Sequence, residues 1–137
     1  MEYDLNRFIS AQEKNYEQAL KEIKNGKKIT HWIWYIFPQL KGLGESYTSQ
    51  FYGLDGIEEA KSYYENDILK KHLLEISNAL LLIDNEIDNI LSFPDNLKLK
   101  SSMTLFNFVD PSEEVFKNII NKFYDGELDQ LTLNLLG

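Results

Sequence analysis

The chain has 137 residues, of which 43% are hydrophobic and 26% are charged, a composition typical of one globular domain and not of a disordered chain. It contains no cysteine, which excludes disulfides, thiol catalysis and cysteine-ligated zinc. Its net charge of −8 argues against a protein that wraps a nucleic-acid backbone, because such a surface is cationic. A small anionic ligand needs only two or three local donors, so it remains compatible with this charge.

The sequence predicts a cytoplasmic protein without a membrane span. Acidic residues, Glu2 and Asp4, stand near the N-terminus where a signal peptide would carry basic ones. The longest aliphatic run, residues 79–83, is far too short to cross a bilayer. The oligomeric state stays open.

A first helix is predicted from Asp4 or Asn6, either of which can cap it, to about residue 25. Apolar residues recur along it at helical spacing, and Gly26 is suited to end it in the left-handed region. Thr30 is expected to cap the aromatic segment that follows.

Residues 31–44, HWIWYIFPQLKGLG, form the most unusual stretch of the chain. Its aromatic rings cannot all point to one side of a helix, so protein surrounds the segment on more than one side, or part of it lines a cavity. Pro38 ends any helix there, and the glycines at positions 42 and 44 allow an open turn. The segment is thus either a pocket wall or a buried helix followed by a turn.

Further helices are predicted along the rest of the chain, with Ser46, Asp67, Asp95, Ser112 and Asp129 as caps. The expected ranges are 46–52, 56–65, 67–83, 87–93, 96–109, 112–124 and 130–136. No stretch alternates cleanly as a strand does, and no linker or repeat divides the chain. The sequence therefore predicts an all-α fold, with residues 1–137 forming one domain of about seven or eight helices.

Residues 98–104, KLKSSMT, carry more lysine and hydroxyl side chains than an interior helix face usually holds. Serine and threonine are indifferent helix formers, so their density calls for a reason. One reason is that their donors converge on an anion, and the alternative is close contact between helices. Since Arg7 is the only arginine, lysine would supply most of the positive charge at an anion site.

Several common motifs are missing from the sequence. It has neither a glycine-rich phosphate loop nor a dinucleotide fingerprint. The two histidines, His31 and His72, lie too far apart to form a metal-binding pattern, and we interpret His72 as structural or exposed. We therefore predict no metal and no cofactor.

The sequence resembles a small bacterial family of uncharacterised, single-domain helical proteins. The resemblance is carried by HWxW at residues 31–34, IFPQ at 36–39, GLG at 42–44 and LKLKSSMTLF at 97–106, and it covers nearly the whole chain. Some members are labelled calpastatin, a label that no residue here supports. More distantly, the family is similar to the NADAR superfamily, a mainly helical fold linked to N-glycosidic bonds of ribosyl phosphates and ADP-ribosylated groups. The catalytic motifs of that superfamily do not map onto this chain.

The resemblance and the residues together predict a pocket for a nucleotide, an ADP-ribose-like molecule or a ribosyl phosphate. Trp32 or Trp34 would stack on the base, and the lysines and hydroxyls would hold phosphate. The expected ligand-binding residues are Trp32, Trp34, Gln39, Lys98, Lys100, Ser101, Ser102 and Thr104.

Asp129 and His31 are the candidate catalytic residues, because either can supply acid–base chemistry for an N-glycosidase-type hydrolase. Two alternatives stay open. The pocket could bind a small anion without turnover, or the chain could be a protein-interaction domain whose acidic face contacts a basic partner.

Overall fold

The computed structural model describes residues 3–137, and within them the chain forms nine helices and no strand. The helices are α1 (Asn6–Lys24), α2 (Ile33–Ile36), α3 (Tyr47–Tyr52), α4 (Gly56–Glu65), α5 (Asp67–Leu81), α6 (Ile87–Ile90), α7 (Asp95–Val109), α8 (Glu114–Tyr124) and α9 (Gln130–Leu136). The predicted all-α fold is confirmed. The helix count exceeds the predicted seven or eight because the aromatic segment also contains a helix, the four-residue turn α2.

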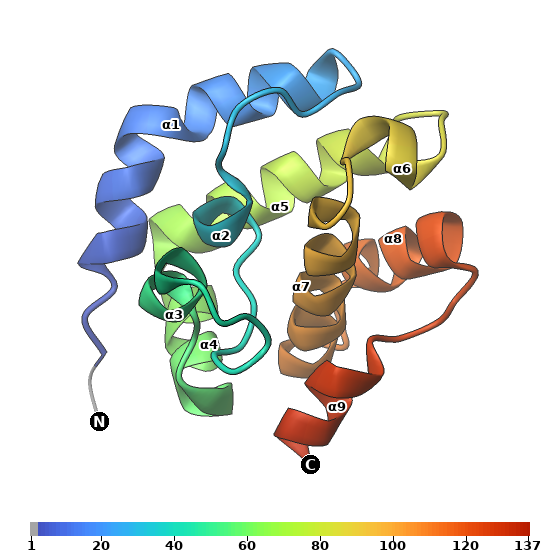
Figure 1. Cartoon of the computed structure of the whole chain (residues 1–137). Coiled ribbons are helices and arrows are strands. Elements are labelled where there is room, and N and C mark those ends of the chain that lie inside the picture. The colour runs from blue at the N-terminus through green and yellow to red at the C-terminus, as the bar shows by residue number, and fades with distance from the viewer. Residues whose placement is uncertain (1–2) are drawn as a thin grey trace.

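Helix α7 is the centre of the fold. It contacts α2, α4, α6, α8 and α9, and Figure 1 shows it with α8 behind it and α9 below it. Residues 101–106 are buried without interruption, because neighbours surround this part of the helix. The hydroxyl side chains of residues 98–104 therefore lie largely in contacts between helices, which was the second of the two explanations offered for them from the sequence.

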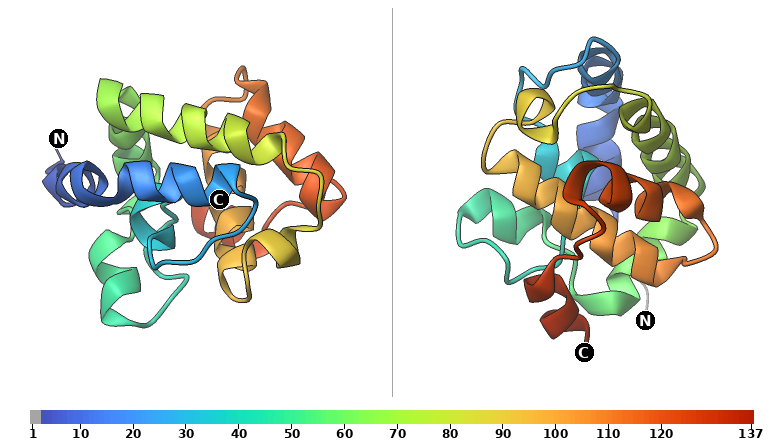
Figure 2. Two further views of the ribbon diagram at one scale, coloured as in Figure 1. Left: turned by 90° about the horizontal axis from the view of Figure 1, so that it is seen from above. Right: turned by 90° about the vertical axis from the view of Figure 1, so that its right-hand side faces the viewer.

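Helices α1 and α5 lie side by side on one face of the molecule, as the view from above shows (Figure 2). Below them, aromatic rings join the helices into one core. The rings of Phe8 and Tyr63 meet edge to face at 5.0 Å, and Tyr63 lies 5.6 Å from Phe106. Such contacts between large apolar side chains supply much of the stabilisation of a small domain.

The helix caps agree with the sequence at some positions and differ at others. Ser46 and Asp129 cap α3 and α9 as predicted, each accepting from a backbone N–H in the first turn. The predicted cap Asp67 is wrong, because the side chain of Asn66 accepts the bonds that start α5. Thr30 is also not a cap, since α2 begins three residues later and the Thr30 hydroxyl bonds elsewhere.

Arg7 fixes the position of α3 relative to α1. Its guanidinium donates to the carbonyl oxygens of Phe51 at 2.8 Å and Gly53 at 3.3 Å, and it pairs with buried Glu59 at 3.1 Å. These bonds satisfy backbone carbonyls at the end of α3. The wall that α3 contributes to the groove described below is therefore held by contacts from a distant helix.

Across residues 3–137, none of the helices combines the length and the apolar character that a membrane crossing requires.

Candidate functional site

Trp32 lies in the core, where it is 1% exposed. Its indole nitrogen donates to the carboxylate of Glu22 at 2.9 Å. The same carboxylate accepts from the backbone N–H groups of Ile29 and Thr30, from the Thr30 hydroxyl and from Gln18. Trp32 therefore cannot stack on a ligand, and of the two tryptophans only Trp34 remains available for one.

The Glu22 carboxylate is strongly held in its charged form. Burial raises its pKa, but the hydrogen bonds from Thr30, Gln18 and Ile29 outweigh burial and lower the pKa to about 2. Glu22 thus ties the loop between α1 and α2 to the end of α1. Glu22 was not among the residues selected from the sequence, although an acidic residue beside the apolar face of α1 indicates a buried polar contact.

Trp34, two residues later, has the opposite surroundings. It is half-buried, and its indole Nε1, itself shielded from solvent, has no hydrogen-bond partner among residues 3–137. The ammonium of Lys98 lies 5.9 Å from the centre of its ring. A buried donor without an acceptor costs about 1–3 kcal/mol, so this position is a candidate for ligand contact.

An inner cavity of about 260 Å³ lies beside the first half of α7. Several residues selected from the sequence line it, and they come from three distant segments of the chain. These residues are Gln39, Lys98, Lys100, Ser101 and Asp129. The tertiary structure thus brings much of the predicted ligand site to one place.

An outer cavity of about 360 Å³ adjoins the first, and the two share Pro94 and Lys98. It is lined by Trp34 and by His31, whose side chain is exposed. Phe93, which is 76% exposed, stands at its edge. We refer to the inner and outer cavities together as the groove.

The lysines of the groove differ in how their charge is used. Lys100 pairs with Glu127 at 2.7 Å, and Lys28 pairs with Asp95 at 2.8 Å. Lys98 forms no ion pair within the described part of the chain. Lys98 is therefore the groove cation whose charge is available to an anion.

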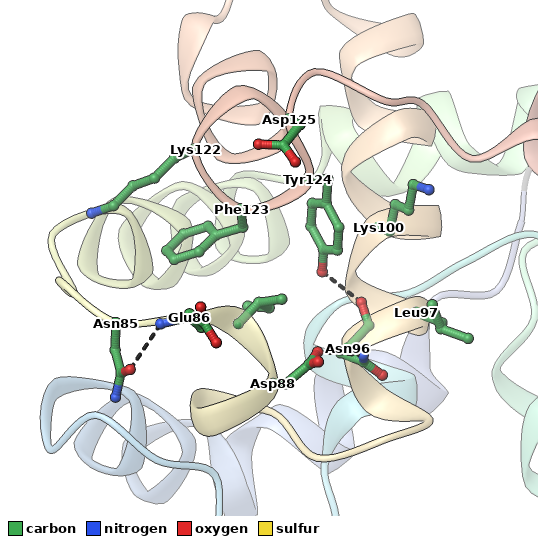
Figure 3. Close-up of a pocket in the computed structure, with 11 residues that line it drawn as sticks. Asn85, Glu86, Asp88, Asn96, Leu97, Lys100, Lys122, Phe123, Tyr124 and Asp125 are labelled. Carbon is green, nitrogen blue, oxygen red and sulfur yellow. Dashed lines mark hydrogen bonds between the residues drawn. The ribbon is translucent and has the colours of Figure 1, made fainter.

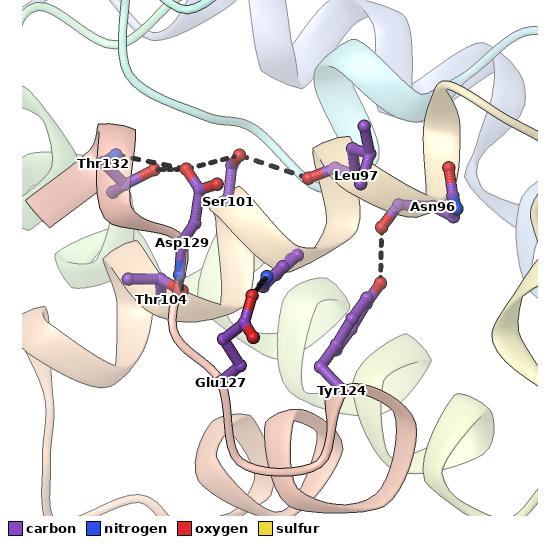
Figure 4. Close-up of polar contacts among 9 residues, drawn as sticks. Asn96, Leu97, Ser101, Thr104, Tyr124, Glu127, Asp129 and Thr132 are labelled. Carbon is purple, nitrogen blue, oxygen red and sulfur yellow. Dashed lines mark hydrogen bonds and ion pairs between the residues drawn. The ribbon is translucent and has the colours of Figure 1, made fainter.

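One carboxylate oxygen of Asp129 holds neighbouring parts of the fold together (Figure 4). Its Oδ2 accepts from Ser101 Oγ at 3.0 Å, from the Thr132 hydroxyl and from the Thr132 N–H that starts α9. Its own N–H donates to Thr104 Oγ1 at 2.9 Å. The second oxygen, Oδ1, accepts no hydrogen bond among the described residues, so it is free to act on a group in the inner cavity.

Two of the predicted phosphate ligands lie inside the protein. Ser102 is fully buried and Thr104 is 1% exposed, and neither lines the groove. Thr104 holds the backbone of Asp129, as described above, and Ser102 lies within the contacts of α7. These side chains cannot reach a ligand in the groove, because the helices around α7 cover them.

A third cavity, of about 460 Å³, lies on another side of α7, between α6 and the end of α8 (Figure 3). Its lining includes the acids Glu86, Asp88 and Asp125. The ammonium of Lys122 bonds to the carbonyl of Leu81, and Lys100 pairs with Glu127. The positive charges at this cavity are thus engaged elsewhere, and it does not suit an anion.

His72 is structural, which is one of the two expected alternatives. Its ring stacks on Tyr16 at 3.7 Å, and its Nδ1 lies 2.8 Å from Gln12 Oε1. Burial lowers its pKa. Within residues 3–137, no cluster of histidine and acidic side chains has the arrangement of a metal site.

Comparison with known proteins places the chain in a family. The model of DUF1810, a family of proteins of unknown function, matches residues 2–136. A crystal structure of the conserved hypothetical protein Rv1873 from Mycobacterium tuberculosis is 38% identical in sequence. It superimposes with a TM-score of 0.96, covering 98% of this chain and 96% of that one. A search of curated proteins found no match. The chain belongs to the DUF1810 family.

Proposed function

We propose that this member of the DUF1810 family binds a small anionic, nucleotide-like ligand in the groove beside α7. The observation that carries the proposal is the position of Lys98. Its ammonium has no carboxylate partner among the described residues, and it stands where the inner and outer cavities meet. In a protein of net charge −8, an unpaired lysine in a hollow favours an anion over other ligands.

The two cavities suit different parts of such a ligand. The outer cavity offers the aromatic residues Trp34 and Phe93, which contact rings. The inner cavity offers the Gln39 amide and the Asp129 carboxylate, which bond to hydroxyl groups. The outer volume lies within the roughly 300–1,000 Å³ typical of small-molecule sites and the inner one just below it, and a nucleotide would span both past their shared residues Pro94 and Lys98.

The catalytic form of the proposal is an N-glycosidase-type hydrolase. Asp129 is the residue for this role, because it lines the inner cavity and its Oδ1 accepts no hydrogen bond among the described residues. A carboxylate there would stabilise an oxocarbenium-like centre or take a proton from water. The resemblance to the NADAR superfamily motivates ribosyl substrates. Without turnover, the same groove would serve as a sensor of its ligand.

Calorimetry with AMP, ribose 5-phosphate and ADP-ribose tests the binding proposal. We expect a dissociation constant below about 1 mM for at least one of them, weakened about tenfold or more in Lys98→Met. Lys117→Met is the matched control, because Lys117 is exposed on α8, away from the groove. Binding to none of the three at millimolar concentration would contradict the proposal.

Chromatography of the same mixtures separates hydrolase from sensor. Asp129→Asn preserves the cap of α9, since asparagine caps helices as well as aspartate does. If the protein is a hydrolase, the wild type splits AMP with one water into adenine and ribose 5-phosphate, whereas this variant binds AMP and releases neither product. If neither releases product, the sensor form stands.

A further inference from the structure

A narrow crevice lies beside the inner and outer cavities and shares lining residues with each of them. Hydrogen-bond donors stand among its largely apolar walls. Trp34 of α2, Gln39 of the following loop, Ser49 of α3 and Lys98 of α7 all line it. Among the described residues, no aspartate or glutamate takes part in this lining. In a chain with 22 acidic residues, four donors gathered without a carboxylate form a local site for negative charge.

The donor hydrogens of these four side chains are free within residues 3–137. Trp34 Nε1 is buried without a partner, and Lys98 has no ion pair. Ser49 Oγ accepts from Ser46 at 2.9 Å, which leaves its own hydrogen available. Gln39 is only 8% exposed as a residue, but its side-chain amide is not among the buried polar groups that lack a partner. Of the four donors, Trp34 Nε1 is therefore the one that is buried without an acceptor, and such a donor favours an acceptor from outside the chain.

The backbone holds the crevice in shape. Leu54 N–H donates to the carbonyl of Gln39 at 2.9 Å, and Lys41 N–H donates to Leu54 at 2.8 Å. Gly44 allows Ser49 to approach, because a Cβ at position 44 would lie 2.6 Å from Ser49 Oγ. Ser49 and Gln39 are thus fixed against each other by contacts between segments that are separate in the sequence.

We propose that this crevice, which we call the donor crevice, is a cradle for a phosphoryl group. Resting on the function proposed above, this inference assigns the ligand class as small metabolites with a terminal phosphoryl group. Three terminal oxygens of a phosphate monoester match four donors better than the two oxygens of a carboxylate do. Trp34 then donates its N–H to the phosphoryl group, while Lys98 lies over its ring.

The anion site therefore differs from the one expected from the sequence. That expectation placed phosphate against the hydroxyls of Ser101, Ser102 and Thr104. These hydroxyls are either bonded to neighbours or covered, as described above. Of the α7 donors, Lys98 alone remains at the anion, and the other donors come from α2, α3 and the loop between them.

Entry of the phosphoryl group requires one side chain to move. The space within the crevice is nowhere wide enough for a water molecule. Lys98 lines the crevice, the inner cavity and the outer cavity, so its side chain separates these three spaces. Because a lysine side chain is long and flexible, its outward rotation opens the crevice while its ammonium stays within reach of the anion.

Matched ligand pairs test the cradle. We expect calorimetry to show ribose 5-phosphate binding at least about tenfold more tightly than ribose, and AMP more tightly than adenosine by a similar factor. Trp34→Phe removes the indole N–H and Ser49→Ala removes the hydroxyl, so each should weaken only the phosphorylated ligands. Ser10→Ala is the control, because Ser10 is exposed on α1. Circular dichroism confirms that each variant is folded.

The outcomes distinguish the two proposals. If phosphorylated and unphosphorylated partners bind equally well, the groove binds ligands and the cradle is wrong. If Trp34→Phe and Ser49→Ala weaken both members of a pair alike, their contacts are not to phosphate and the cradle is again wrong. If no ligand binds, both proposals fail. A selective loss of phosphate affinity, seen also as reduced ³¹P line broadening with inorganic phosphate, supports the cradle.

Discussion

Trp32 and Trp34 stand two residues apart, yet the fold uses them in opposite ways. Trp32 is 1% exposed and donates to Glu22 at 2.9 Å. Trp34 is half-buried beside the groove, with an indole N–H that has no acceptor among residues 3–137. The first indole is part of the structure that holds the α1–α2 loop, and the second lines the place where we expect a ligand.

The difference lies in the partners and not in the residue type. A carboxylate that accepts five hydrogen bonds completes the surroundings of Trp32. No corresponding acceptor faces Trp34 within the described residues, and a lysine lies over its ring instead. A satisfied buried polar group stabilises a fold, whereas an unsatisfied one calls for a further explanation, and for Trp34, which lines the outer cavity, that explanation is a ligand.

Replacing Glu22 is expected to change the stability of the protein more than any other substitution proposed for the two tryptophan sites. In Glu22→Gln the amide oxygen can still accept from the N–H groups of Ile29, Thr30 and Trp32, but the amide NH2 then faces Gln18 and the Thr30 hydroxyl, which lose their acceptor. The negative charge that strengthens all five bonds is also lost. We expect a loss of about 3 kcal/mol in the free energy of unfolding, measured with urea at pH 7. Glu17→Gln, on the exposed side of the same helix, should change it by less than about 0.5 kcal/mol. Equal effects of the two substitutions would show that the Glu22 contacts are unimportant.

Lowering the pH tests whether the ionised Glu22 carboxylate is what stabilises the surroundings of Trp32. Because the pKa of Glu22 falls from 4.5 to about 2 on folding, its carboxylate stabilises the fold above pH 4.5, and this contribution is lost as the pH falls towards 2. The unfolding free energies of the wild type and Glu22→Gln should therefore converge between pH 5 and pH 2. A constant gap between the two proteins across this range would contradict the role given to the ionised carboxylate.

Exchanging each tryptophan for phenylalanine compares the two indoles directly. Trp32→Phe leaves Glu22 without one donor and creates a small cavity, so we expect it to lose about 1–3 kcal/mol of stability. Trp34→Phe removes an N–H that has no partner and should cost less than about 1 kcal/mol. Thermal unfolding measures both. Acrylamide should quench the remaining fluorescence more strongly in Trp32→Phe, which keeps Trp34, and the reverse order would refute the assignment.

Changing Gly44 tests the groove side alone and is expected to affect stability less than Glu22→Gln. An alanine Cβ there would lie 2.6 Å from Ser49 Oγ and 2.8 Å from Ser49 Cβ, so Ser49 must shift. We expect a cost of about 1 kcal/mol, together with weaker binding of ribose 5-phosphate. The emission of Trp32, measured in the Trp34→Phe background, should stay unchanged. A change in that emission would mean that the two regions are coupled.

Local patterns in the sequence predicted much of the helical framework. Pro38 follows the end of α2, Ser46 and Asp129 cap helices, and Gly26 has a φ of 88° after α1. Such features depend on residues within a few positions of one another, so they can be read without knowing the fold. Asp67 was wrong as a cap because its neighbour Asn66 takes that role. Thr30 was wrong because its hydroxyl donates to Glu22 of α1, a contact that the local sequence does not show.

The sequence by itself determined the helical class of this protein and the residue types from which a groove could be built. Only the tertiary structure decided which of those residues meet. It turned Trp32 towards Glu22, covered Ser102, and brought Gln39, Ser49 and Lys98 to one crevice. The physical reason is that helix periodicity is set by neighbours along the chain, whereas the partner of a buried polar group is set by whichever distant segment packs against it.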